Sequence, residues 1–374
     1  MERPVSSYLD SASGEPLHPA AYDVLQRALE QGYADPRRLH GPARTARLLL
    51  DNARAAVADS LGVRPDEVTF TPSGTHAVHL GILGLLAGAA RSGKRLLASS
   101  VEHSSVLHAG RWHQERGGVF DTVPVDPTGR VTLAALEDAG PAAVLALQSA
   151  NHEVGTLQPV AEAAGLGIPV FVDACASGGR LPLPDGWATA ALSAHKWGGP
   201  AGVGVLLVRK GARWRNPFPA DDRADERGTG MENVPAALAA AAALQAVVAE
   251  RDTVNARQHA LVARIRAAIA RIPDTEVVGD PDERLPHLVT FSCLYVDGEA
   301  LVTELDRHGF AVASGSACTS STLEPSHVLA AMGALTHGNV RVSLSRDTSE
   351  AEVDRLVAVL PDVVAGIRAR VGAP

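Results

Sequence analysis

The sequence predicts an α/β protein with a large domain built on an open, mostly parallel sheet and a smaller α+β domain. Its 374 residues are enough for two or three domains of about 150 residues each. Helical and strand-like segments alternate up to about residue 250, which is typical of a parallel sheet covered by helices. After that point the order is less regular, which indicates a separate α+β unit.

The helices of the first part are predicted from apolar residues at helical spacing. The clearest example is 44–61, where Leu48, Val57 and Leu61 lie on or near one stripe. The helices are expected at 19–31, 44–61, 76–90, 104–114 and 132–138, and the strands at 67–71, 95–99, 119–125, 143–148, 169–173 and 203–208. The last three strands are apolar throughout, as in strands buried on both faces. The longest loop is expected at 219–232, which has mixed charges.

The second part of the chain is predicted to start with a long helix and to end with another. The helices are expected at 254–272, 299–308 and 349–371, and the strands at 287–294, 310–313 and 339–344. The polar stretch around Cys318 is expected to be a long loop, with roughly twenty residues between Cys318 and Arg341.

Composition narrows the function classes. Hydrophobic residues are 46% and charged residues 20%, which excludes a disordered chain. The balance of 34 basic against 42 acidic side chains gives a net charge of −8, so no direct nucleic-acid partner is predicted. The apolar run 235–249 stops at Glu250 and is expected to be too short to cross a membrane. With no signal peptide evident, we predict a cytoplasmic protein without a membrane partner.

Cysteine is scarce, with three residues far apart in sequence, so neither a disulfide framework nor a metal site is predicted. Cys175 and Cys293 sit in apolar strand-like runs and are expected to be small buried residues. Cys318 is flanked by Ser, Gly, Ala and Thr, which indicates a loop with a reachable thiol.

Lysine is equally scarce, so chemistry that needs an amine has three candidates. Lys94 lies in a polar turn, and Lys210 follows a strand and precedes a glycine; both are expected to be solvated. Lys196 stands in the sequence SAHKWGG, between Ser, His and Trp and before two glycines. It is a candidate reactive amine, and an ordinary loop lysine is the alternative.

Unusual polar residues follow the strands of the predicted sheet, at the edge where such sheets bind ligands. Ser73, Gly74 and Thr75 stand between a strand and a helix, where free N–H groups bind anions or a side chain simply caps the helix. Asp173 ends an apolar strand and is either a cap or the partner of a buried cation. His103 also follows a strand, and a half-buried structural role is its alternative.

The combination indicates a cofactor. A phosphate cradle, the strand-end Asp173 and His103, and the amine of Lys196 would together hold pyridoxal 5'-phosphate. The amine would attach the cofactor covalently, and the carboxylate would keep the pyridine nitrogen protonated so that the ring accepts electrons. The imidazole would stack on the ring.

The motifs resemble those of the cysteine desulfurases, a family within the class-V aminotransferase-like group. The resemblance covers nearly the whole chain. It is carried by segments 8–10, 70–75, 102–103, 172–174, 193–196 (SAHK), 314–318 (SGSAC), 324–329 (EPSHVL) and 340–343. The order and spacing of the SAHK and SGSAC motifs are specific to this family.

The resemblance implies the fold-type I architecture of pyridoxal-phosphate enzymes. It implies a cofactor-binding domain over 17–250 and a small domain made of 1–16 and 251–374 that carries the cysteine loop. Lys196 would bind the cofactor and act with His103 and Cys318 in catalysis. Further contacts with the phosphate would come from Ser193 and His195. The substrate carboxylate would be clamped by Arg341, with Asn151 also at the substrate.

Several positions depart from the family pattern. His152 stands where the family usually has an Asn that contacts the phenolic oxygen of the cofactor, and Ala176 stands where a Gln often does the same. His152 is the expected replacement donor. A threonine that reaches the phosphate from the partner subunit corresponds to Thr229 or a neighbour of it. Residues 13–16 also differ from the usual Ala-Thr-Thr-Pro.

The resemblance implies that L-cysteine is converted to L-alanine while its sulfur passes as a persulfide on Cys318 to an acceptor protein, and that the enzyme is a homodimer. A selenocysteine lyase or another C–S lyase with the same cofactor is an alternative, and a sulfur-relay scaffold is a more distant one. A nicotinamide oxidoreductase is disfavoured because no G-x-G-x-x-G motif follows an early strand. The acceptor could serve iron–sulfur assembly, tRNA thiolation, DNA modification or secondary metabolism.

Overall fold

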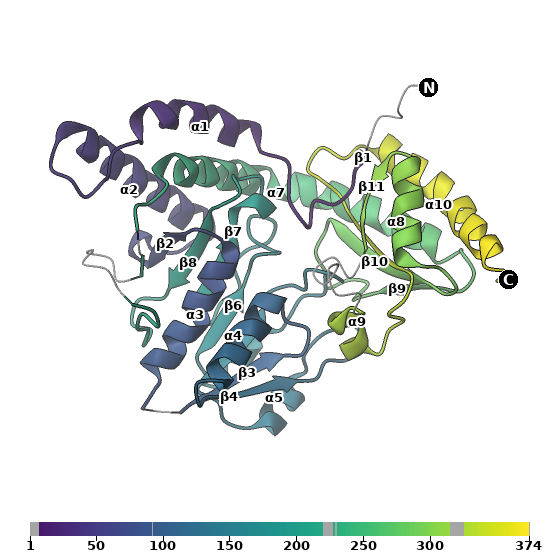
Figure 1. The fold of residues 1–374 in the computed structure, drawn as a ribbon, viewed down its shortest axis with the longest axis horizontal. Coiled ribbons are helices and arrows are strands. Elements are labelled where there is room, and N and C mark those ends of the chain that lie inside the picture. The colour runs from purple at the N-terminus through teal and green to yellow at the C-terminus, as the bar shows by residue number, and fades with distance from the viewer. Residues whose placement is uncertain (1–6, 92, 220–226, 229, 315–324, 374) are drawn as a thin grey trace.

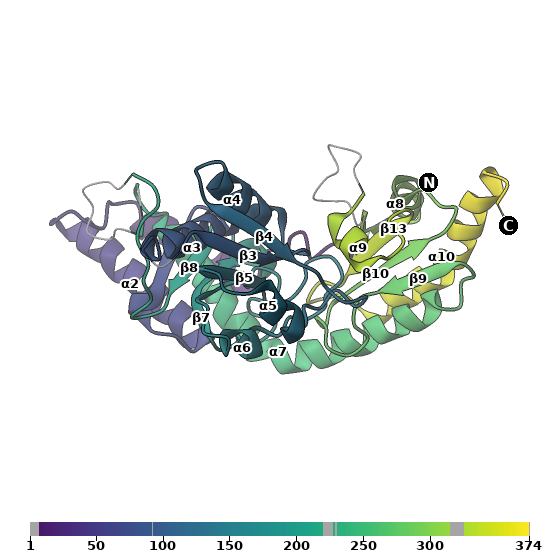
Figure 2. The ribbon, with the colours of Figure 1, turned by 90° about the horizontal axis from the view of Figure 1, so that it is seen from below.

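The computed structural model describes residues 7–91, 93–219, 227–228, 230–314 and 325–373. Two hydrophobic cores lie beside each other, and the 36-residue helix α7 (Val234–Ile269) runs along both (Figures 1 and 2). The N-terminal half of α7, with Val234 and Leu244, belongs to the first core, and the C-terminal half, with Leu261 and Ile265, belongs to the second.

The first core surrounds a seven-stranded sheet of order β2-β8-β7-β6-β5-β3-β4. Its strands are β2 (Val68–Thr71), β3 (Arg95–Ser99), β4 (Val119–Val123), β5 (Val144–Gln148), β6 (Val170–Asp173), β7 (Trp187–Ser193) and β8 (Gly204–Val208). The five strands from β7 to β4 run parallel, and β8 is antiparallel to both of its neighbours. The predicted open, mostly parallel sheet is therefore confirmed.

Helices cover both faces of this sheet because alternate residues of each strand point to opposite sides. In β5, Val144 and Ala146 pack with α3 and α4, whereas Leu145 and Leu147 pack in the core of α2 and α7. The helices are α1 (Pro19–Gln31), α2 (Gly41–Leu61), α3 (Gly74–Gly88), α4 (Ser104–Gln114), α5 (Leu133–Ala139) and α6 (Val160–Ala164).

The second core lies between a smaller antiparallel sheet of order β12-β13-β10-β9 and three helices. Its strands are β9 (Thr275–Val278), β10 (Leu288–Cys293), β12 (Ala313–Ser314) and β13 (Asn339–Ser343), and its helices are the end of α7, α8 (Gly298–Arg307) and α10 (Glu350–Arg370). A two-stranded parallel pair of β1 (Ser7–Tyr8) and β11 (Phe310–Ala311) brings the start of the chain to this side.

The structure corrects four sequence predictions. Four elements were not predicted, β7, α6, β9 and α9, and the strand expected at 310–313 is divided between β11 and β12 in different sheets. The long region after Cys318 is not all loop, because α9 (His327–Met332) lies within it. The helix expected at 254–272 is only the second half of α7.

Helix α7 also changes the interpretation of the apolar run 235–249, because the helix continues past Glu250. By length and composition α7 could cross a membrane, and half of its most apolar window is buried inside the protein. Its first half packs against α1 and α2, as the core helix of a globular protein does. The predicted domain boundary at residue 250 falls inside this helix, and the division into domains stays a prediction.

Candidate active site

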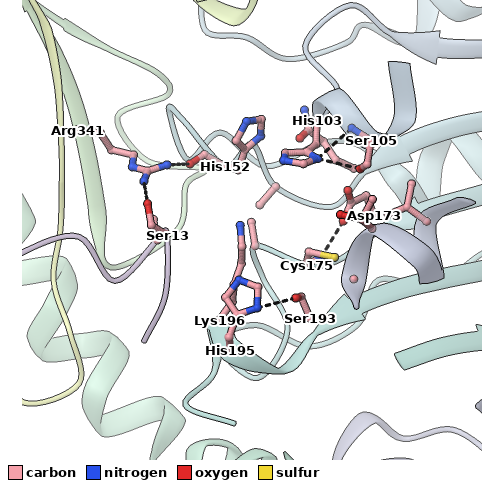
Figure 3. A pocket seen from close by; sticks show the side chains of 17 residues that line it. Ser13, His103, Ser105, His152, Asp173, Cys175, Ser193, His195, Lys196 and Arg341 are labelled. Atoms are coloured by element: carbon pink, nitrogen blue, oxygen red, sulfur yellow. Dashed lines mark hydrogen bonds between the residues drawn. The ribbon is translucent and has the colours of Figure 1, made fainter. Parts of the chain in front are cut away.

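A cavity of about 280 Å³ opens at the carboxyl ends of the parallel strands, between the two cores (Figure 3). Its walls come from the ends of β6 and β7, the start of α3, the opening segment of the chain, and β13. It brings together nine of the predicted site residues: Gly74, Thr75, His103, His152, Asp173, Ser193, His195, Lys196 and Arg341.

The first turn of α3 forms a cradle for an anion. Ser73 caps the helix, its hydroxyl accepting a hydrogen bond from the His76 amide at 3.1 Å. A Cβ atom at Gly74 would lie 2.7 Å from Cβ and 2.9 Å from Oγ of Ser193, so only glycine lets the helix approach the end of β7 this closely. Ser193 Oγ lies 3.1 Å from Nδ1 of His195. Backbone N–H groups, the helix dipole and these side chains suit a phosphate group.

Asp173 presents a buried carboxylate at the end of β6. Its Oδ1 accepts a hydrogen bond from the backbone N–H of Cys175 at 2.9 Å. The residue is therefore a cap for the turn that follows, and it also lines the cavity, where its carboxylate would suit a protonated ring nitrogen. The two roles considered for Asp173, a cap and the partner of a buried cation, are therefore compatible.

His103 is held as a neutral imidazole. It is the N-cap residue of α4: its Nδ1 accepts a hydrogen bond from the Ser105 amide at 3.2 Å and lies 2.8 Å from Ser105 Oγ. Because Nδ1 is an acceptor for the amide, the ring proton is on Nε2. Burial lowers the pKa of His103 to about 4.

His152 lies edge-on to His103, with their ring centroids 4.9 Å apart. Neither ring nitrogen of His152 has a hydrogen-bond partner among the described residues, although the side chain is buried. Burial, together with nearby positive groups such as Lys196, lowers the pKa of His152 well below its usual range. The neutral ring therefore offers one donor and one acceptor to a ligand.

Lys196 enters the cavity from the short 3₁₀ turn (Ala194–Lys196) that ends β7. It is half-buried, whereas Lys94 and Lys210 are exposed. The prediction that the other two lysines are solvated is confirmed, and Lys196 is the lysine that the structure places among the site residues.

Arg341 approaches from β13 in the second core. Its Nη2 donates to Asp10 Oδ1 at 2.9 Å and to Ser13 Oγ at 2.7 Å, and its Nη1 donates to the carbonyl of His152 at 3.0 Å. Nε is buried and has no partner among the described residues. The contact with Asp10 demonstrates that a carboxylate fits against this guanidinium at the rim of the cavity.

Some predicted site residues are not in the cavity. The buried side chain of Asn151 donates to the Val101 carbonyl at 3.0 Å and accepts from the amides of Glu153 and Val154 at 2.8 and 2.9 Å, so it shapes the turn that carries His152. Ser73 caps α3 rather than lining the cavity. Thr229 and Cys318 lie outside the described residues.

Sequence reasoning did not assign several residues that line the cavity to the site, among them the polar side chains of Ser13, Ser105, Gln148 and Cys175. Cys175 was expected in a buried strand, but β6 ends at Asp173 and the thiol reaches the cavity from the turn that follows. The signal for it was its position two residues after a strand-end carboxylate. Cys293 is buried at the end of β10, as predicted.

The residues present fit pyridoxal phosphate. A Cβ atom would fill the glycine cradle, His152 lines the space with ring nitrogens that have no hydrogen-bond partner among the described residues, and an amine, a carboxylate and a neutral imidazole surround it. The cradle suits a phosphate, the amine an aldehyde, the carboxylate a protonated ring nitrogen and the neutral imidazole the face of a ring. His152 could then bind a polar substituent of the ring.

The buried histidines predict an acid-labile fold. The pKa values of His103, His152 and His287 lie below their unfolded value of about 6.5, so the unfolded chain binds protons first as the pH falls. We expect cofactor-free protein to lose stability from about pH 6.5 downward, by up to about 3 kcal/mol for His103 alone. The buried carboxyls of Glu102 and Glu153 act in the opposite direction, because burial raises the pKa of both, to about 7 for Glu153, but they are fewer than the histidines whose pKa values are lowered.

Urea unfolding at a series of pH values measures this effect. A midpoint that is constant or rises between about pH 7 and about pH 5 would contradict the expectation.

Comparison with known proteins agrees with this site. The family model "Aminotransferase class-V" matches residues 7–356. An IscS-like cysteine desulfurase of Mycobacterium tuberculosis is 35% identical over 97% of this chain and 97% of its own length. The cysteine desulfurase IscS of Methanosarcina thermophila is 31% identical over 96% of this chain and 92% of its own. The solved structure of a NifS-like protein superposes with a TM-score of 0.89 at 26% identity, covering 97% of this chain and 100% of that one.

Proposed function

The chain belongs to the class-V aminotransferase family and is a cysteine desulfurase within it, and from that premise we propose that it converts L-cysteine to L-alanine in the cavity around Lys196 and passes the sulfur through Cys318 to an acceptor protein. Enzymes of this family use pyridoxal phosphate. The expected fold-type I architecture is confirmed by the superposition with the NifS-like protein.

Each functional group of the cofactor has a candidate partner in the cavity. The phosphate would lie on the first turn of α3, with Thr75, Ser193 and His195 around it. Lys196 would attach the cofactor, Asp173 would face its ring nitrogen, and His103 would cover the ring. When bound, pyridoxal phosphate supplies the electron sink for breaking bonds next to the α-carbon of the substrate.

The residues of the chain then have separate tasks. Arg341 binds the substrate carboxylate through its terminal nitrogens, of which Nη2 now donates to Asp10 and Ser13 and Nη1 donates to the carbonyl of His152. The Nζ atom of Lys196 takes the proton from the α-carbon of the substrate. Neutral His103 carries its proton on Nε2, where it can exchange a proton with the substrate thiol.

The sulfur is transferred to Cys318. Its thiolate attacks the sulfur of the substrate, so that an S–S bond forms while the bond between that sulfur and the β-carbon breaks. The electron pair of the broken bond stays with the carbon, which takes up a proton to become the methyl group of alanine. The acceptor then removes the outer sulfur atom of the persulfide.

The observation that carries this proposal is the convergence of Lys196, Asp173, His103 and the α3 cradle on one cavity in a chain that matches cysteine desulfurases over nearly its whole length. We expect the purified protein with L-cysteine and a reductant to release alanine and sulfide in equal amounts. Release of selenide from selenocysteine without any alanine from cysteine would contradict it and favour the selenocysteine lyase.

We propose that the enzyme is a homodimer that uses the face formed by α1, α2 and the segment between them. Large apolar side chains are exposed there: Tyr22, Leu29, Tyr33, Leu39 and Leu48. Arg37 in the same segment donates to the Gly230 carbonyl at 3.2 Å and to Glu232 at 2.7 Å. The segment that follows Thr229 is therefore held at this face, in support of a phosphate contact made across a dimer.

Light scattering tests the dimer. We expect a mass of twice the 38.8 kDa chain, and we expect Leu39→Glu combined with Leu48→Glu to shift it toward the monomer, because two charges would be buried without partners. Val371→Glu, at an exposed site near the C-terminus, is the matched control. A monomeric wild-type protein that holds the cofactor tightly would contradict the proposal.

A further inference from the structure

A second, much smaller cavity lies directly behind Lys196. Its volume is about 10 Å³, and it is lined by Ser11, His152, Arg180, Lys196 and His287 together with Ala12, Ala176, Leu285 and Leu288. His152, Lys196, Ala12 and Ala176 line the active-site cavity as well, so the two cavities adjoin. The small cavity is about the size of one water molecule.

Two buried imidazoles line this cavity and have ring nitrogens without a hydrogen-bond partner among the described residues, although Nε2 of His152 lies 3.7 Å from Oε1 of Glu153. His287 directly precedes β10 and is 2% exposed, and its Nδ1 has no hydrogen-bond partner among the described residues. The same holds for both ring nitrogens of His152. Buried polar atoms that find no protein partner are ordinarily bonded to an ordered water. Burial lowers the pKa of His287 well below its usual range, so each ring offers both a donor and an acceptor.

We propose that this cavity holds one ordered water, bound by His152 and His287, which exchanges protons with the Nζ atom of Lys196. The inference rests on the proposed function, in which Lys196 takes the α-proton of the substrate. In each exchange the Lys196 ammonium gives one proton to the water and receives another from it. The net charge of the site is unchanged, and no oxidant or reductant is needed.

Further polar side chains lie between the small cavity and the surface, on a route for protons that does not pass the substrate. Arg180 lines both the small cavity and a further one of about 30 Å³ on the far side. His18 lines this further cavity, and its buried Nε2 has no hydrogen-bond partner among the described residues. Glu250, a half-exposed residue, also lines it. Arg180, which pairs with Glu15 at 2.6 Å, therefore connects the small cavity near Lys196 with the cavity lined by His18 and Glu250.

Deuterium retention tests the exchange. L-Cysteine deuterated at the α-carbon is turned over by the holoenzyme, and the alanine formed is examined by mass spectrometry for deuterium at that carbon. In wild type we expect almost none, because the proton on Lys196 is replaced through the water before it returns. In His287→Phe, which removes the polar nitrogen and fills the space, retention should rise several-fold toward a ceiling of about one third, because a lysine ammonium carries three protons.

Two further variants control for structural damage. His287→Gln keeps a polar group and should stay near the wild-type retention, and His308→Phe, at an exposed histidine of α8's C-terminus, should not change it. Crystal structures of the wild-type and His287→Phe holoenzymes should show the water between His152 and His287 only in the former.

The outcomes are distinct. Absence of the water from the wild-type structure, or equal deuterium retention in wild type and His287→Phe, would overturn the proposal. If the proposed function itself fails, wild type makes no alanine from cysteine, and the presence or absence of the water in the crystal structure still decides whether the site exists.

Discussion

Replacing Lys196 with alanine should abolish covalent attachment of the cofactor and reduce desulfuration by at least about 10²- to 10⁴-fold, the range that a positioned acid–base group contributes. The residue lies in the short turn that follows β7, next to His195, and it is the lysine that the structure places in the cavity. Removing it leaves Asp173, His103 and the α3 cradle in place. The variant should therefore still bind pyridoxal phosphate, but without a covalent bond.

Borohydride reduction of the wild-type enzyme followed by peptide mapping measures the attachment, and it should label the peptide that contains Lys196. Lys94→Ala and Lys210→Ala are matched controls, because both side chains are exposed, and they should keep wild-type attachment and turnover. A label on the Lys94 or Lys210 peptide would show that the active site is assigned wrongly.

Much of the site was predictable because its residues follow strands. The carboxyl ends of parallel strands meet at one edge of a sheet, so the strand-end Asp173, His103 and the turn at Gly74 had to lie near each other once the βα alternation was recognised. The scarcity of lysine reduced the choice of amine to three, and the neighbours of Lys196 distinguished it.

Other features depended on packing that no local pattern reveals. Strand β7 was missed because its sequence, WATAALS, is rich in Ala, a weak strand former, and only its place between β6 and β8 makes it a strand. Only the second half of helix α7 was predicted as a helix, and the continuity of its two halves arises from packing in two different cores.

Two residues near Lys196, His287 and Asn151, also have surroundings that no local sequence pattern reveals. His287 was read as the start of a strand, because its position behind Lys196 arises only when the second core docks on the first. Asn151 was placed at the substrate, whereas its side chain donates to the Val101 carbonyl and accepts from the two backbone amides of the turn that follows it. In both cases the residue type was a reasonable candidate and the direction of the side chain decided its role.

Replacing Cys318 with alanine should remove most sulfide release from L-cysteine while leaving cofactor binding intact. Both ends of the segment that carries Cys318 are attached beside the cavity. At one end, Ser314 of β12 pairs with Val340, next to Arg341. At the other, the Ser326 hydroxyl donates to Glu153 at 2.5 Å, adjacent to His152. Cys318 falls between these two attachments in the sequence, and its small polar neighbours favour access of the thiol to a substrate held by Arg341.

The cofactor spectrum of Cys318→Ala should match that of wild type, because Lys196, Asp173 and the α3 cradle need no help from Cys318. Cys175→Ala is the matched control for loss of a thiol: burial raises the pKa of Cys175 well above its usual range, so this thiol stays protonated and its loss should spare sulfide release. In wild type, brief treatment with L-cysteine without reductant should add one sulfur atom to the Cys318 peptide, as read by mass spectrometry. If Cys318→Ala still makes alanine at the wild-type rate, the sulfur does not pass through Cys318. Direct expulsion of sulfide from the bound substrate, as in a C–S lyase, would then be the mechanism.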